Sequence, residues 1–91
     1  MDEFIEVTYV ESAFKHGIPE VEIEECLFNE DDLPLILRSK QDASVKVAYG
    51  QSYSGQYLEV AFRVVNQSVW CVFHAMPMRD ADKKRFRKKR K

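Results

Sequence analysis

The stretch from Leu58 to Val64 constrains the fold more than any other part of the chain. Its apolar residues alternate with Glu59, Ala61 and Arg63, which is typical of a strand with one buried face. Asn66-Gln67-Ser68 supplies turn residues, and the apolar run from Val69 to Phe73 leads back. Because a connection this short does not permit a parallel crossover, we expect these two strands to be antiparallel.

Further strands are predicted on the N-terminal side of this pair. Val45, Val47 and Tyr49 alternate with small or polar residues, and the segment from Gly50 to Gly55 carries turn residues. The sequence therefore predicts an antiparallel meander of three strands. Residues 35–37 form a short candidate strand, and residues 4–10 are rich in β-branched and aromatic side chains, so they predict a strand at the N-terminal end.

Two short helical segments are expected between the first strand and the meander. Ser12 can cap a helical turn that Gly17 ends by taking a positive φ. Pro19 suits the first turn of a helix whose buried stripe is Ile23, Cys26 and Leu27. The expected fold class is α+β, with the N-terminal strand and short helices packed on an antiparallel sheet of about three to four strands.

Charge divides the chain unevenly, although its formal net charge is only −1. From Pro77 onward, nine Lys or Arg residues face two Asp residues, so this end carries +7 and residues 1–76 carry −8. We therefore expect a single domain over residues 1–78 and a basic tail over residues 79–91, helical and then frayed. Such a tail is suited either to phosphate, to an acidic partner or simply to solvation.

Cysteine and histidine usage gives no sign of a metal or disulfide framework. Cys26 and Cys71 are far apart in sequence and lie among apolar neighbours, as core thiols of a reducing compartment do. Two histidines without a cysteine cluster or a carboxylate partner are not a ligand set, so we expect neither a metal nor a cofactor. No signal peptide or membrane-length apolar run is present, which favours a cytoplasmic protein without membrane association.

The order and spacing of several segments resemble a known family. Lys15-His16-Gly17-Ile18 precedes a predicted helix, and Tyr49-Gly50 leads through Gly55 into Leu58-Glu59-Val60 and a strand–turn–strand unit. Over residues 12–80 this arrangement is similar to the BrnT family of bacterial toxins, of which the chain looks like a divergent member. Where that family carries Ser-Ala-Arg after its last strand, this chain has Phe73-His74-Ala75-Met76-Pro77-Met78-Arg79.

The resemblance implies a RelE-like fold and the toxin role of a type II toxin–antitoxin system. It further implies a metal-independent endoribonuclease that acts on RNA and is neutralised by a DNA-binding antitoxin of the BrnA type. Whether the chain forms a homodimer or a toxin–antitoxin hetero-oligomer stays open at this point. So does a non-catalytic protein-interaction module on the same fold, or a basic-tailed nucleic-acid binder without a partner.

Metal-free RNA cleavage requires an acid, a base and positive charge at the phosphate, which histidine and arginine or lysine can supply. The candidate catalytic residues are Lys15, His16, His74 and Arg79. Each histidine could instead be structural, and Arg79 could instead pair with Asp80 or Asp82. The candidate RNA-binding residues are basic side chains of the tail and one of the sheet: Arg63, Lys83, Lys84, Arg85 and Arg87.

Overall fold

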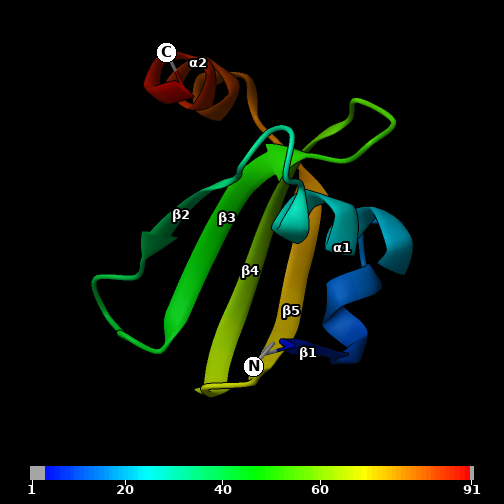
Figure 1. Cartoon of the computed structure of the whole chain (residues 1–91), viewed down its shortest axis with the longest axis vertical. Helices are drawn as coiled ribbons and strands as arrows, with labels where there is room; N and C mark the ends of the chain where they lie inside the picture. Colours follow the sequence, from blue (N-terminus) through cyan, green and yellow to red (C-terminus); the bar gives the residue numbers. More distant parts are fainter. Residues whose placement is uncertain (1–3, 91) are drawn as a thin grey trace.

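The chain folds into one mixed five-stranded sheet, with one α-helix on a face of the sheet and another across one end (Figure 1). The computed structural model describes residues 4–90; residues 1–3 and 91, at the ends of the predicted domain and tail, lie outside it. The elements in chain order are β1 (Glu6–Tyr9), the 3-10 helix η1 (Glu11–Phe14), α1 (Glu20–Phe28), β2 (Leu35–Arg38), β3 (Val45–Gln51), β4 (Tyr57–Asn66), β5 (Val69–Pro77) and α2 (Asp80–Arg90). The α+β class predicted from the sequence is confirmed.

The meander predicted from alternation is present as β3, β4 and β5, with β3 antiparallel to β4 and β4 antiparallel to β5. The candidate strand at residues 35–37 also forms, and pairs antiparallel with β3. One detail differs: Gly50 and Gln51 belong to β3, and the tight turn begins at Ser52. Gly50 is therefore not a turn residue, because the ladder with β4 continues to the pair Gln51 and Tyr57.

The sheet is larger and less uniform than the sequence predicted. Its order is β1-β5-β4-β3-β2, so it has five strands rather than three or four. β1 lies parallel to β5, from Glu6 opposite Val69 to Tyr9 opposite Val72. β1 and β5 can be parallel because a long connection joins them. The chain passes from β1 through η1, α1, β2, β3 and β4 before it enters β5.

α1 covers one face of the sheet, and the predicted stripe of Ile23, Cys26 and Leu27 is buried there. Pro19 caps the helix instead of standing in its first turn. Ser12 does not cap η1; Val10 holds that position. The Ser12 hydroxyl instead donates to the carbonyl oxygen of Phe73, at 2.7 Å, which ties η1 to the edge of β5.

β5 carries an irregularity that turns its last residues toward the other face. Ala61 pairs with His74, whereas Phe62 pairs with Val72, so Phe73 is an extra residue on β5. Directly opposed residues of an antiparallel pair share a face. His74 therefore shares its face with Ala61, whereas Phe62 packs in the core on the α1 side.

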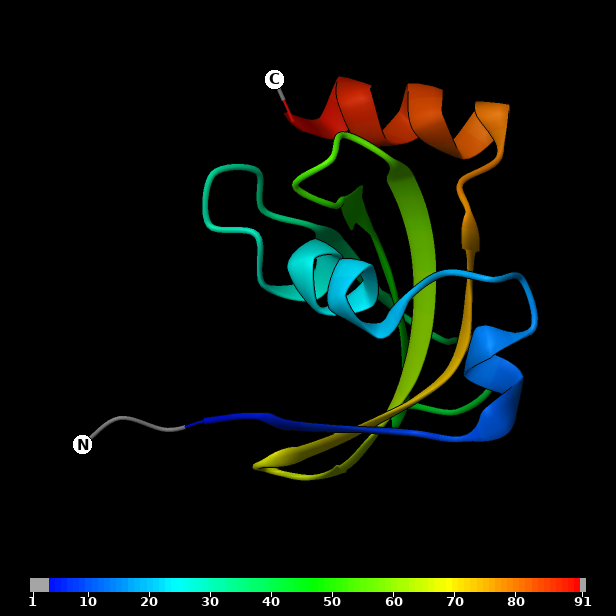
Figure 2. The same ribbon diagram turned by 90° about the vertical axis from the view of Figure 1, so that its right-hand side faces the viewer.

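α2 lies across the end of the sheet where β3 and β5 finish and β4 begins (Figures 1 and 2). Phe86 is only 1% exposed and Met78 is also buried, so both anchor the helix. The Phe86 ring meets the Tyr57 ring edge-on, with 6.1 Å between the centroids. Among the described residues, no helix is long and apolar enough to cross a membrane.

Candidate active site on the open face of the sheet

Two histidines from opposite ends of the chain meet beside β5. His74 lies near the end of β5, on the face that α1 does not cover. His16 follows η1, in the turn that Gly17 completes with a φ of +77°. Their ring centroids are 5.7 Å apart and the rings meet edge-to-face at 79°. The structure thus brings together two residues that sequence analysis could only nominate separately.

Glu59 of β4 holds the imidazole of His74. Its Oε2 lies 3.2 Å from Nε2 of His74, and the residue is only 8% exposed although it sits on the face opposite α1. A carboxylate accepts hydrogen bonds, so it selects the tautomer in which Nε2 carries the proton and Nδ1 has a free lone pair. Its second oxygen, Oε1, is buried and accepts no hydrogen bond from the described residues.

Arg79 joins the same cluster from the segment between β5 and α2. Its Nη2 lies 3.7 Å from Oε1 of Glu59, and its Nε lies 3.6 Å from Oδ2 of Asp82. Pairing of Arg79 with Asp82 was one of the alternatives that the sequence left open. Both contacts are long for hydrogen bonds, and the Arg79 side chain is 69% exposed. Its guanidinium can therefore still meet an anion from solvent.

Tyr49 lies beside the Glu59 carboxylate in a partly buried position. It pairs with Glu59 across the β3–β4 ladder. Burial, and then the negative charges of Glu59 and Asp82, raise the pKa of its hydroxyl. Tyr49 therefore stays protonated and can donate a hydrogen bond at physiological pH.

Three of the predicted catalytic residues converge, and the fourth does not. His74 and Arg79 contact Glu59, and His16 contacts His74, whereas Lys15 is exposed and forms no hydrogen bond or ion pair with these residues in the described part of the chain. We call His16, Glu59, His74 and Arg79 the histidine cluster. No set of three or more His, Cys, Asp or Glu among residues 4–90 could hold a metal ion.

The predicted RNA-binding residues separate into three places. Arg63 lies far down β4 and pairs with Asp42 at 2.9 Å, and this pairing together with Ser44 lowers the pKa of Asp42 to about 2. Arg85 of α2 lies 3.4 Å from Asp82. Lys83 and Arg87 reach the Tyr57 ring, and Lys84 is an exposed residue of the same helix. Only the residues of α2 lie near the histidine cluster.

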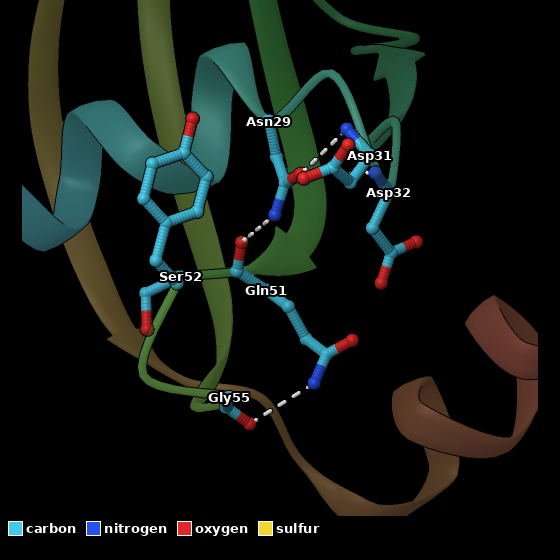
Figure 3. A pocket seen from close by; sticks show the side chains of 7 residues that line it. Asn29, Asp31, Asp32, Gln51, Ser52 and Gly55 are labelled. Atoms are coloured by element: carbon cyan, nitrogen blue, oxygen red, sulfur yellow. Dashed lines mark hydrogen bonds between the residues drawn. The ribbon is translucent and has the colours of Figure 1, made fainter.

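A separate cavity of about 340 Å³ lies between the loop after α1 and the β3–β4 turn (Figure 3). Oδ1 of Asn29 accepts from the backbone N–H groups of Asp31 and Asp32, and its Nδ2 donates to the carbonyl oxygen of Gln51. Gln51 in turn donates to the carbonyl oxygen of Gly55. Because these polar groups bond mainly to neighbouring backbone, they account for the shape of the two loops.

Sequence reasoning missed Glu59 and Tyr49. Glu59 was expected to point away from the core, and it does. The signal that could have identified its role is register: counting back from the Asn66-Gln67-Ser68 turn places Glu59 near His74. The ladder is irregular between Val64 and Asn66 and again between Ala61 and Phe62, and the two shifts cancel, so Glu59 lies opposite Met76 and diagonal to His74 as the count from the turn places it.

Comparison with known proteins gives no external guide to this cluster. No protein-family model, no curated protein and no solved structure matches the chain. Any functional conclusion therefore depends on the chemistry of the residues themselves and on the resemblance noted in the sequence.

Proposed function

We propose that this protein is a metal-independent endoribonuclease of RelE-like fold and the toxin component of a type II toxin–antitoxin system. The observation that supports it best is the meeting of His16 and His74 beside Glu59 and Arg79. An acid, a base and a cation are what metal-free cleavage of RNA requires. The resemblance to BrnT toxins supplies the substrate class and the biological setting.

His74 serves as the general base in this proposal. Because Nε2 is hydrogen-bonded to Glu59, Nδ1 is the nitrogen that takes the proton from the 2′-hydroxyl of the substrate. The oxygen then attacks the neighbouring phosphorus. Glu59 stabilises the imidazolium that results, in the way a carboxylate supports the histidine of a catalytic triad.

His16 serves as the general acid. It is exposed, and its ring contacts that of His74. In the transition state the bond from the 2′-oxygen to the phosphorus forms as the bond to the 5′-oxygen breaks, so two neighbouring imidazoles can act on one linkage. Protonated His16 gives its proton to the 5′-oxygen as the P–O bond breaks, and the products are a 2′,3′-cyclic phosphate and a 5′-hydroxyl.

Arg79 supplies the positive charge at the crowded phosphate. Its exposed guanidinium is held only by long contacts with Glu59 and Asp82, so two N–H groups can turn to the non-bridging oxygens. Lys15 is exposed and precedes His16 in the sequence, so it adds a second positive charge close to that histidine along the chain. A BrnA-type antitoxin neutralises the toxin by covering this surface.

A non-catalytic protein-interaction module is the second candidate. Several apolar side chains on the sheet face that carries the histidine cluster are only half buried. They are Leu35, Leu37 and Val47. α1 packs on the opposite face of the sheet, and α2 contacts β3 at the end of the sheet (Figure 2). Half-exposed apolar side chains on one sheet face favour a protein partner.

Induced expression in a bacterial host tests the proposal. Wild type should arrest growth and fragment RNA, whereas H74A and R79A should relieve both. In a purified assay, H74A should lower the cleavage rate by about 10²- to 10⁴-fold. R63Q, which removes a cation distant from the cluster, is the matched control and should cleave normally. If folded wild type neither slows growth nor cuts RNA, catalysis is excluded and the interaction module takes its place.

A further inference from the structure

The basic residues in α2 and immediately before it are not equivalent, and three of them lie along one line. Arg79 immediately precedes α2, and Lys83 and Arg87 follow it at intervals of four residues. The helix has begun by then, because the N–H of Lys83 bonds to the carbonyl oxygen of Arg79 at 2.9 Å. Residues four apart lie on one face of a helix, and eight residues advance about 12 Å. We call Arg79, Lys83 and Arg87 the cationic stripe.

The Tyr57 ring holds two members of the stripe in place. Nζ of Lys83 lies 5.8 Å and Cζ of Arg87 lies 5.6 Å from the ring centroid. Tyr57 is itself fixed by the buried Phe86. A cation held on an aromatic ring is ordered without being neutralised. Two long side chains are thereby positioned before any ligand arrives, which lowers the entropy cost of binding.

Of the remaining cations that the sequence nominated, Lys84 is exposed and lies over no aromatic ring among the described residues, and the other two are paired with carboxylates. Arg63 and Arg85 lie within salt-bridge distance of Asp42 and Asp82. Arg87, by contrast, has no carboxylate within 4.0 Å among the described residues, and Lys83 approaches only Asp80, whose side chain is 97% exposed and contributes little. The positive charge available to a ligand is therefore concentrated at the Tyr57 end of the stripe.

The other end of the stripe enters the histidine cluster. Arg79 contacts Glu59, and Tyr57 precedes Glu59 by two residues on β4, so their side chains lie on the same face about 7 Å apart along the strand. A phosphate chain bound along the stripe would lead directly to the two imidazoles.

We infer that the cationic stripe binds consecutive phosphates of single-stranded RNA and delivers the adjoining linkage to His16 and His74. This inference depends on the proposed ribonuclease function for its substrate. RNA is favoured over an acidic protein because the stripe ends at groups suited to phosphodiester chemistry. A single strand is favoured over a duplex because the 2′-oxygen must turn into line with the bond that breaks.

RNA binding is measured apart from cleavage in the full-length H74A variant. The binding constant for a fluorescently labelled single-stranded RNA oligonucleotide is determined at salt concentrations from about 50 to 200 mM, because phosphate contacts weaken steeply over this range. Each phosphate contact to a single strand contributes a slope of about −0.7 to log K against log salt. Adding K83Q and R87Q should therefore make the slope shallower by about 1.4 and weaken binding about 25-fold at about 0.1 M salt.

The matched control adds R38Q and K40Q to H74A, which removes the same charge from exposed positions that are not assigned to RNA binding. It should weaken binding less than about threefold. Circular dichroism should show that both multiple variants keep their helix content. Equal losses in the two variants, or unchanged binding in K83Q/R87Q, would overturn the stripe. Tight binding of an acidic peptide with no binding of RNA would overturn it as well.

The same proteins separate this inference from the proposed function. Wild type that binds RNA through the stripe but does not cleave it refutes the catalytic proposal alone. Cleavage by wild type that persists undiminished in K83Q/R87Q refutes the stripe alone.

Discussion

α1 packs so closely on the sheet that a substitution at Gly50 tests the contact between α1 and β3 directly. A Cβ placed on Gly50 would lie 3.1 Å from Sγ of Cys26, 3.1 Å from Cβ of Pro34 and 3.3 Å from the carbonyl oxygen of Cys26. Two of these atoms belong to rigid groups, a proline ring and a helical backbone. The substitution G50A therefore forces the helix and the strand apart.

The expected cost follows from two opposing effects. Overpacking a well-packed core costs about 1–3 kcal/mol, whereas replacing a strand glycine by alanine recovers about 0.5–1 kcal/mol of backbone entropy. Gly50 has no positive φ, so no conformational strain is added. Because the proline ring and the helical backbone cannot yield easily, the overpacking cost should lie in the upper part of its range, about 2–3 kcal/mol. The free energy of unfolding should then fall by about 1–2.5 kcal/mol, which lowers Tm by roughly 4–20 °C in a domain of this size.

Urea denaturation and thermal circular dichroism measure this change, and C26A supplies the control. C26A removes Sγ, one of the three close atoms, so part of the clash disappears when it is combined with G50A. The double variant should lose less stability than the sum of the single variants, by about 0.5 kcal/mol or more. A G50A protein as stable as wild type, or strictly additive losses, would refute the described contact between α1 and β3.

Three further predictions concern other parts of the fold. F86A should cost about 3–5 kcal/mol if α2 unfolds together with the sheet, and a loss of helical circular dichroism without any change in the main unfolding transition would show that α2 docks independently. Burial raises the pKa of Cys26 to about 12, so iodoacetamide at neutral pH should label Cys71 and spare Cys26 in the native protein; equal labelling would contradict the buried position. Hydrogen bonding to Ser44 lowers the pKa of Asp42 from 3.8 to about 2, so its contribution to stability is complete above pH 3.8 and is lost as pH falls through 2; a carboxyl titration by NMR should show S44A moving the midpoint upward, and no movement would rule out that cause.

The sequence alone determined the elements whose burial pattern is local. Alternation through β4 and the turn at Asn66-Gln67-Ser68 specified an antiparallel hairpin. The spacing of Ile23, Cys26 and Leu27 specified the buried side of α1. These predictions succeed because each depends on residues within one strand, one turn or one helix, where the period of the backbone decides which side chains share a face.

Only the tertiary structure decided how distant segments meet. The parallel pairing of β1 with β5 joins residues more than 60 positions apart, and no local pattern encodes that choice. The extra residue at Phe73 is visible only in the ladder, yet it sets the face of His74. Likewise, His16 meets His74 because η1 and the turn that follows it lie against β5. Residue types and periodicity are local properties, whereas a site assembled from three segments depends on strand order and register, which are settled only when the whole core is buried together.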